Sequence, residues 1–126
     1  MNEHMDFRYQ IERMHDVVIV GCSGRMVRGS ALDAFRHQIE ELQHTRILVL
    51  NLSGVDHIDA GGLSVLVILR HWARKNAVRM NLVNPSPVVR ELLETTRLTS
   101  VFEITSLEEA LCILREHPDY PHWAVA

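Results

Sequence analysis

The chain has 126 residues, 47% of them hydrophobic and 23% charged, with a formal net charge of −3 at pH 7. This size and composition fit one globular domain that builds a core without a metal or a disulfide, and they exclude the fibrous and disordered classes. The acidic balance argues against nucleic-acid binding and no apolar run is long enough to cross a bilayer, so we expect a cytoplasmic protein without direct membrane insertion.

The amino-terminal residues predict a β-hairpin. Apolar and polar residues alternate from Phe7 to Ile11, as in a strand with one wet face. Residues 14–16 can turn the chain into a second, more apolar strand at residues 17–22. We therefore expect these two strands to pair in antiparallel fashion.

A helix is predicted after a loop at residues 23–29. Ser30 is placed to cap it, and Asp33 follows three residues later to complete a capping-box-like pair. The face that we expect to be buried holds Leu32, Phe35, Ile39 and Leu42.

The middle of the chain predicts a buried strand, a polar loop and a second helix. Residues 46–52 are almost all apolar, which is typical of a parallel strand covered on both faces. The loop at residues 53–59 leaves from the carboxyl end of that strand. The helix then runs to about Lys75, and residues 63–69 are so apolar that we expect its first two turns to be buried. Ligands and partners favour such strand ends in α/β sheets, so this junction is the candidate functional site.

The remaining elements complete an α/β fold. Residues 78–82 form a further strand, which gives a parallel strand-helix-strand crossover. Ser86 and Pro87 begin a third helix, whose predicted buried stripe is Val88, Val89, Leu92 and Leu93. Residues 101–104 are expected to add a short edge strand, and Ser106 opens a fourth helix with a capping box.

We therefore predict a mixed sheet of four to five strands with an amino-terminal hairpin and about four helices. Residues 1–116 form a single domain in this interpretation. Residues 117–126 contain two prolines and show no periodicity, so we expect them to be an irregular tail.

The start of the second helix has the composition of a docking point. Asp59 can accept hydrogen bonds from the amides of Gly61 and Gly62, and the two glycines leave the backbone open at the positive end of the helix dipole. An acceptor group of a partner could dock there, although Asp59 would repel a free phosphate. The alternative is that residues 59–62 are only a capped, tightly packed helix start.

Three segments together resemble the STAS domain family, the fold of anti-sigma-factor antagonists. Residues 58–66 (IDAGGLSVL) are similar to its signature, in which Asp-Ser-Ser-Gly-Leu-Gly or a close variant stands at the strand-to-helix junction. Residues 17–26 (VVIVGCSGRM) are similar to its second strand and the Gly-X-Leu ending that follows. Residues 80–93 (MNLVNPSPVVRELL) are similar to its fourth strand, proline-bearing turn and third helix. The resemblance covers nearly the whole chain and implies a STAS-like fold.

The resemblance also implies that the usual phosphorylation switch is missing. Phosphorylated members carry a hydroxyl residue directly before the motif's glycine, and Gly61 stands at that position, preceded by Ala60. An acidic residue common in those members aligns with Val27. Ser64 and Ser53 are the nearest alternative acceptors, but a serine inside a helix, as Ser64 is, more often bonds back to a carbonyl than serves a kinase.

These observations predict a non-catalytic regulatory module that docks a protein partner, such as an anti-sigma factor kinase, through the start of its second helix. The loop at residues 23–29 is both apolar and basic, which suits an acidic or apolar partner surface; alternatively it is a solvated turn with Met26 or Val27 tucked in. The predicted partner-binding residues are Arg25, Met26, Val27, Arg28, Ser53, His57, Asp59, Ala60, Gly61, Gly62 and Ser64.

Two other functions stay open. Some STAS proteins attached to lipid-exporting ATPase complexes carry Asp-Thr-Gly-Gly at this junction, and residues 59–62 (DAGG) resemble that version, so the chain could be a cytoplasmic accessory subunit of a transporter. Nucleotide binding at the helix start is the third possibility, against which Asp59 and the lack of a basic clamp argue. A homodimer is also compatible with the sequence.

Nothing in the sequence predicts an enzyme, a cofactor or a metal site. The eight histidines are scattered, without the spacing of a ligand set, and no nucleophile or second acid accompanies His57. Cys22 and Cys112 stand in apolar contexts and are interpreted as reduced core residues.

Overall fold

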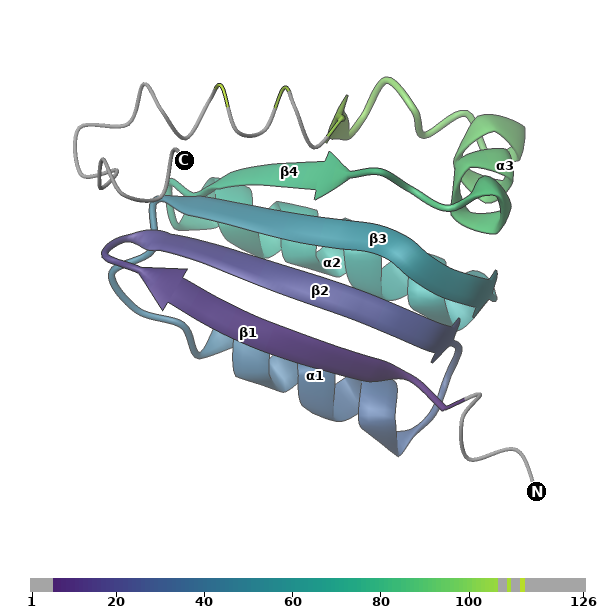
Figure 1. The fold of residues 1–126 in the computed structure, drawn as a ribbon, viewed down its shortest axis with the longest axis horizontal. Helices are drawn as coiled ribbons and strands as arrows, with labels where there is room; N and C mark the ends of the chain where they lie inside the picture. Colours follow the sequence, from purple (N-terminus) through teal and green to yellow (C-terminus); the bar gives the residue numbers. More distant parts are fainter. Residues whose placement is uncertain (1–5, 107–108, 110–111, 113–126) are drawn as a thin grey trace.

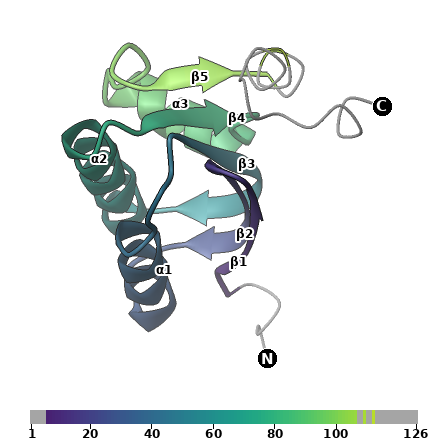
Figure 2. The ribbon, with the colours of Figure 1, turned by 90° about the vertical axis from the view of Figure 1, so that its left-hand side faces the viewer.

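The computed structural model describes residues 6–106, 109 and 112, which form a single sheet with three helices. The five strands follow one another across the sheet in chain order, and only the first pair is antiparallel. They are β1 (Arg8–Met14), β2 (Val17–Met26), β3 (Ile47–Ile58) and β4 (Arg79–Val83), labelled in Figure 1, and β5 (Glu103–Thr105), labelled in Figure 2.

The three helices are α1 (Ser30–Glu40), α2 (Ala60–Lys75) and α3 (Pro87–Thr95). Figure 2 shows α1 and α2 side by side on one face of the sheet. The third helix packs against β3, near the end of that strand that extends beyond β4 (Figure 1).

Alternation along the strands sorts the apolar side chains onto the two faces of the sheet. The main core lies under α1 and α2 and includes Val20, Leu50 and Leu66, each fully buried. A smaller cluster on the opposite face includes Val17 and Val49. The central strands are therefore buried on both sides, as their continuous apolar sequences predicted.

The predicted α/β architecture is confirmed: the amino-terminal hairpin, the β3-α2-β4 crossover and the short edge strand are all present. The described residues contain three helices rather than about four. The amide of Glu109 donates to Oγ of Ser106 at 3.1 Å, as the capping box predicted, but most of the helix expected there and residues 117–126 lie outside the described residues.

Four details of the prediction are wrong. The segments expected to be loops at residues 23–29 and 53–59 are mostly strand, because β2 continues to Met26 and β3 to Ile58. Gly29, not Ser30, precedes α1, and no side chain caps that helix. Cys112 is exposed rather than part of the core.

The fourth error concerns which helix positions are buried. Val67 of α2 is 41% exposed and Val88 of α3 is 38% exposed, although both were expected inside. A helix that packs against one layer buries a single stripe, so apolar residues outside that stripe reach the surface. Across the described part of the chain, no helix has the length and apolar character needed to span a membrane.

Candidate functional site

The pairing of β2 with β3 changes character at the end of the sheet that carries the candidate site. Residues 17–21 face residues 47–51 without interruption, but the register then shifts by one residue between Gly21 and Ser23 and again between Gly24 and Arg25. Gly24 adopts a φ of 86°, which glycine reaches without strain. Such irregularities bend a strand and redirect its side chains, and here they bring Arg25 opposite His57.

Asp59 joins three segments at the start of α2. Its carboxylate accepts a hydrogen bond from the amide of Gly62 at 2.9 Å and another from the amide of Arg28 at 3.2 Å, while its own amide lies 3.5 Å from the carbonyl oxygen of Met26. Partial burial raises the pKa of Asp59, but the backbone amides of Gly62, Arg28 and Gly61 outweigh that effect and hold the pKa below its ordinary value. The predicted cap is confirmed, and it also anchors the turn that follows β2.

The glycines at this junction are required by close packing. A Cβ atom on Gly62 would stand 2.1 Å from the carbonyl oxygen of Met26 and 2.9 Å from Cγ1 of Ile58. On Gly61 it would stand 3.0 Å from Cβ of Arg28 and 3.1 Å from a carboxylate oxygen of Asp59. The first contact excludes any side chain, whereas the contacts at Gly61 are tight, so the turn at Arg28 must shift by a few tenths of an ångström to admit a side chain there.

The prediction that the two glycines leave the backbone open for docking is wrong at Gly62, and the amide of Gly61 also interacts with the Asp59 carboxylate. Gly62 is buried, and its amide is already bound to Asp59. The carboxylate of Asp59 occupies the place where an external anion would meet the helix dipole. The capped, tightly packed alternative describes this part of the junction correctly.

The outer side of the junction remains a surface. Arg28, Ala60 and Ser64 are exposed, and Val27 and Gly61 are partly exposed; these five residues are called the α2 start surface below. Oγ of Ser64 donates to the carbonyl oxygen of Ala60 at 2.8 Å, which is the backbone bond that its sequence context predicted. Val67, one turn further along α2, extends this surface with an exposed apolar side chain.

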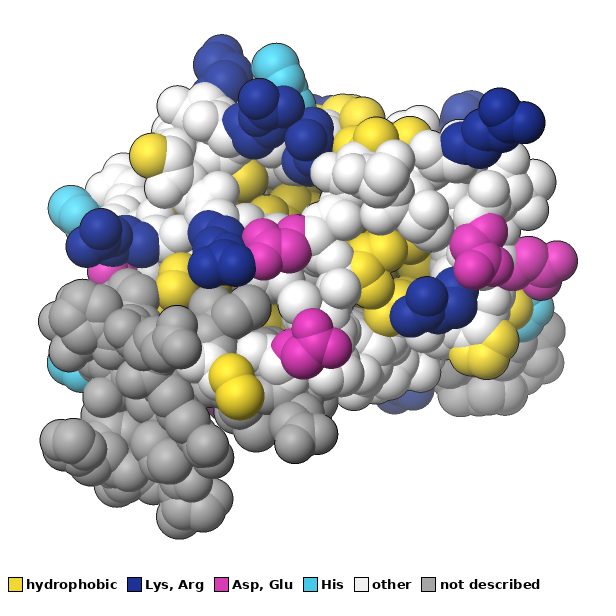
Figure 3. Space-filling view, turned by 90° about the horizontal axis from the view of Figure 1, so that it is seen from above, with side chains coloured by type: hydrophobic (Ala, Val, Ile, Leu, Met, Phe, Trp, Pro, Cys, Tyr) yellow, Lys and Arg dark blue, Asp and Glu magenta, His cyan; other side chains and the backbone are white. Residues whose placement is uncertain are grey.

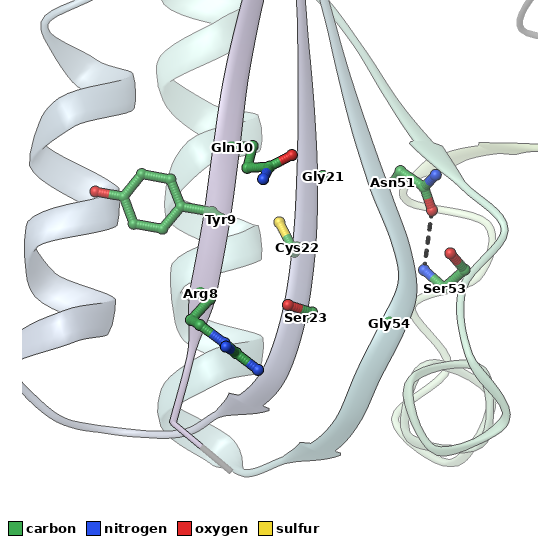
Figure 4. A pocket seen from close by; sticks show the side chains of 9 residues that line it. All are labelled: Arg8, Tyr9, Gln10, Gly21, Cys22, Ser23, Asn51, Ser53 and Gly54. Atoms are coloured by element: carbon green, nitrogen blue, oxygen red, sulfur yellow. Dashed lines mark hydrogen bonds between the residues drawn. The ribbon is translucent and has the colours of Figure 1, made fainter. Parts of the chain in front are cut away.

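Two of the predicted contact residues lie elsewhere. Met26 is fully buried in the main core, so it is not available to a partner. Ser53 lines a separate hollow formed by β1, β2 and β3 (Figure 4), where its amide donates to Oδ1 of Asn51 at 3.0 Å. The sequence could not separate Ser53 from the site, because the register shift that redirects it depends on the pairing with β2.

His57 lies at the end of β3 and has a neighbour that the sequence analysis did not single out. Its Nδ1 atom stands 3.0 Å from Oδ1 of Asp56, and both side chains are about half exposed. Asp56 is the extra, unpaired residue at the second register shift. An extra residue disturbs the alternation of side chains along a strand, so the neighbouring side chains of Asp56 and His57 can approach each other. The sequence pointed to this pair only in that Asp56 directly precedes His57.

The described histidines are dispersed over the surface, and Cys22 is buried. The five described histidines, His15, His37, His44, His57 and His71, are exposed. Within residues 6–106, 109 and 112, no three His, Cys, Asp or Glu side chains form a group suited to a metal ion. Burial raises the pKa of the Cys22 thiol to about 12, which suits the core residue that was predicted.

Comparison with known proteins agrees with this architecture. The family model of the STAS domain matches residues 8–110. The fold is similar to that of the Bacillus anti-sigma factor antagonist SpoIIAA in its unphosphorylated form, with a TM-score of 0.72 and 21% sequence identity over 87% of this chain and 98% of that one. SpoIIAA also has a structure in its phosphorylated form.

Two further solved structures widen the comparison. An anti-sigma factor antagonist from Mycobacterium paratuberculosis has a TM-score of 0.72 and 23% identity over 88% of this chain and 96% of its own. A sulfate transporter family protein from Wolinella succinogenes has a TM-score of 0.65 and 19% identity over 78% of this chain and 84% of its own. Identities this low establish a shared fold. Among curated proteins, none matches the chain by sequence.

Proposed function

Because this chain belongs to the STAS domain family, we propose that it is a non-catalytic regulatory module, similar to an anti-sigma-factor antagonist, that docks a protein partner through the α2 start surface. The clasp made by Asp59 supports this proposal, since it fixes the turn at Arg28 against the first turn of α2. A surface held in one conformation loses little entropy when a partner binds.

One observation carries the proposed mode of regulation. The family resemblance assigns the phosphorylated hydroxyl to the position of Gly61. This residue is partly exposed on the surface and has no side-chain hydroxyl that a kinase could phosphorylate. The nearest hydroxyl in the helix belongs to Ser64 and is bonded to the backbone. Docking therefore does not depend on phosphorylation at the usual position, and we expect it to be constitutive.

The surface also suggests the chemistry of the partner. Arg25 and Arg28 are exposed near the end of β2, and Val67 presents an apolar side chain on the exposed side of α2. A partner with an apolar contact area and an acidic rim would match both features. An anti-sigma factor kinase is one class of candidate.

The test compares two substitutions that differ only in charge. Gly61→Asp and Gly61→Asn add side chains of equal size, so both meet the tight contact with Cβ of Arg28. The carboxylate alone imitates the charge of a phosphate, and opposite an acidic partner it should weaken binding by about 1 to 3 kcal/mol.

The measurement is partner capture from the native cell. It compares the amount of partner bound by the unaltered chain and by each variant. We expect the Asn variant to keep the partner and the Asp variant to release it. Retention by both would show that the partner binds another face. Loss from both would indicate that steric change, not charge, controls docking.

An accessory role in a transporter is the second candidate. The DAGG sequence at residues 59–62 and the similarity in fold to a sulfate transporter family protein favour it. The captured partner distinguishes the two, because a transporter ATPase or permease supports this role and an anti-sigma factor supports the first. Nucleotide binding at the start of α2 is less favoured, because Asp59 already places a negative charge there.

A further inference from the structure

A groove lies beside the α2 start surface, between the end of β3 and α3. It has a volume of about 300 Å³ and is lined by Asp56, His57, Ile58, Val88, Glu91, Leu92 and Thr95. In Figure 3, acidic and hydrophobic side chains lie near one another at the end of the molecule where α3 lies, with a basic side chain beside them. The groove therefore combines an apolar floor with an acidic rim.

The helix α3, on one side of the groove, has apolar side chains at its surface in addition to those that it buries in the core. Val89 and Leu93, one turn apart, are fully buried in the main core. Val88 and Leu92 form a second stripe, displaced by one residue, that faces the groove. Val88 is 38% exposed there, which makes it one of only three large hydrophobic residues that are exposed in the described part of the chain.

The strand on the other side has a free edge. The last pair between β3 and β4 joins Asn51 and Val83, and the amide of Ser86 donates to the carbonyl oxygen of Leu52 at 3.3 Å. Residues 53–58 of β3 therefore have no strand beside them on the α3 side within the described residues. Ile58 contributes a partly buried apolar side chain to the groove. Such an edge can receive part of another chain, and a groove beside it supplies pockets for side chains.

The Asp and Glu side chains that line the groove are not balanced by a Lys or Arg in the lining. Asp56 and Glu91 supply two carboxylates, and His57 lies 3.0 Å from the first of them. None of the seven lining residues is a lysine or an arginine. An apolar floor inside a negative rim complements a segment with an apolar side chain between positive ones.

We propose that this β3–α3 groove receives a short segment of the partner in which a leucine-like or aromatic side chain is flanked by lysines or arginines. The inference rests on the proposed docking function and extends it to a second contact next to the α2 start surface. The two surfaces differ in charge, since Arg25 and Arg28 border the first and Asp56 and Glu91 border the second. A partner would then need acidic and basic regions in a matching arrangement, which sets its orientation.

Synthetic peptides provide a probe that does not require the partner. We would titrate the full, isotope-labelled chain with the capped peptide Lys-Lys-Leu-Lys-Lys and follow backbone amides by NMR. The controls are Lys-Lys-Ser-Lys-Lys, which lacks the apolar side chain, and Glu-Glu-Leu-Glu-Glu, which reverses the charge. We expect the leucine-lysine peptide to shift the amides of residues 56–58 and 88–95 and to bind at least about threefold more tightly than either control.

Two substitutions on α3 sharpen the test. Glu91→Lys reverses a charge on the rim, whereas Glu94→Lys makes the same change at an exposed position of the same helix outside the groove. We expect Glu91→Lys to weaken binding of the leucine-lysine peptide by at least about threefold and Glu94→Lys to leave it unchanged. Glu91→Gln serves as a milder variant if the reversal disturbs folding, which the dispersion of the same spectra reveals.

The proposal is overturned if the shifts map to another surface, if the acidic peptide binds equally well, or if the variants at positions 91 and 94 behave alike. Its failure is separable from that of the proposed function. If the peptides do not enter the groove but Gly61→Asp still releases the captured partner, only the groove is wrong. If the groove binds as expected but both Gly61 variants keep the partner, the α2 start surface is wrong.

Discussion

The two halves of the β2–β3 pairing differ in regularity and in what they support. In the half that begins at Val17 and Ile47, every residue has one partner, and the side chains alternate between two buried faces. In the half that ends at Met26 and Ile58, the register shifts twice and the strands extend beyond β4. The first is called the regular half and the second the shifted half.

The difference shows how one pair of strands can serve both stability and recognition. Uninterrupted pairing lets the regular half bury its side chains on both faces. Irregular pairing leaves residues of the shifted half at the surface, where Asp59 closes the junction with α2 and Asp56 and His57 border the groove. The candidate site therefore lies where the pairing is least regular, and the tests below compare the two halves.

The largest effect is expected from adding one methyl group at the start of α2, where the helix packs against the shifted half. Gly62→Ala would place Cβ 2.1 Å from the carbonyl oxygen of Met26, so we expect it to lower the free energy of unfolding by about 3 kcal/mol or more. Gly21→Ala is the control in the regular half, because its Cβ would meet nothing within 4 Å. It should stay within about 1 kcal/mol of the unaltered chain. Urea unfolding measures both, and equal values would contradict the close packing at Gly62.

A smaller effect is expected from removing the clasp. Asp59→Ala eliminates the acceptor for the amides of Gly62 and Arg28, and loss of a helix cap typically costs about 1 to 2 kcal/mol. Ser64→Ala, one turn into the same helix, removes only a bond from a side chain to its own helix and should change stability by less than about 0.5 kcal/mol. The same unfolding measurement compares them. If the two variants were equally stable, Asp59 would not be holding the junction.

The smallest expected effect is the dependence of the free energy of unfolding on pH. The pKa of Asp59 is lower in the folded chain than its ordinary value, so ionised Asp59 stabilises the fold above the ordinary carboxyl pKa of about 4. That contribution is lost as the pH falls through the lower, folded-state pKa. Unfolding of the unaltered chain and of Asp59→Asn, measured from pH 7 to below pH 3, should therefore show a stability difference that narrows with acid.

Among the described residues, Glu103 also has a carboxyl pKa below its ordinary value. Its hydrogen bond with the Arg79 guanidinium lowers its pKa, but it titrates in both proteins and its effect cancels in the comparison. If the stability difference between the two proteins did not change with pH, the charge of Asp59 would not contribute to the stability of the fold.

The sequence predicted the features that follow from periodicity and from local capping. Alternating and continuous apolar residues located the strands, and Asp59 before two glycines located the start of α2. The extension of β2 to Met26 was missed because Ser23, Gly24 and Arg25 are typical of loops. They form strand here because β3 lies beside them, which is a tertiary effect that local propensity does not contain.

The groove was missed for a related reason. Val88, Val89, Leu92 and Leu93 looked like one buried stripe, but a helix that packs on one side can bury only Val89 and Leu93 completely. The direction of α3 relative to β3 decides which pair is left outside. That direction depends on contacts distant in sequence, so the pattern alone could not assign Val88 and Leu92 to a surface.

The central claim, that docking on the α2 start surface proceeds without a phosphorylation switch, is tested most directly by the state of the native protein. Mass spectrometry of the chain isolated from its own cells, with and without bound partner, would locate any phosphoryl group. We predict none on Ser53 or Ser64 in either fraction. A phosphoryl group on either serine, enriched in the fraction without partner, would contradict the account.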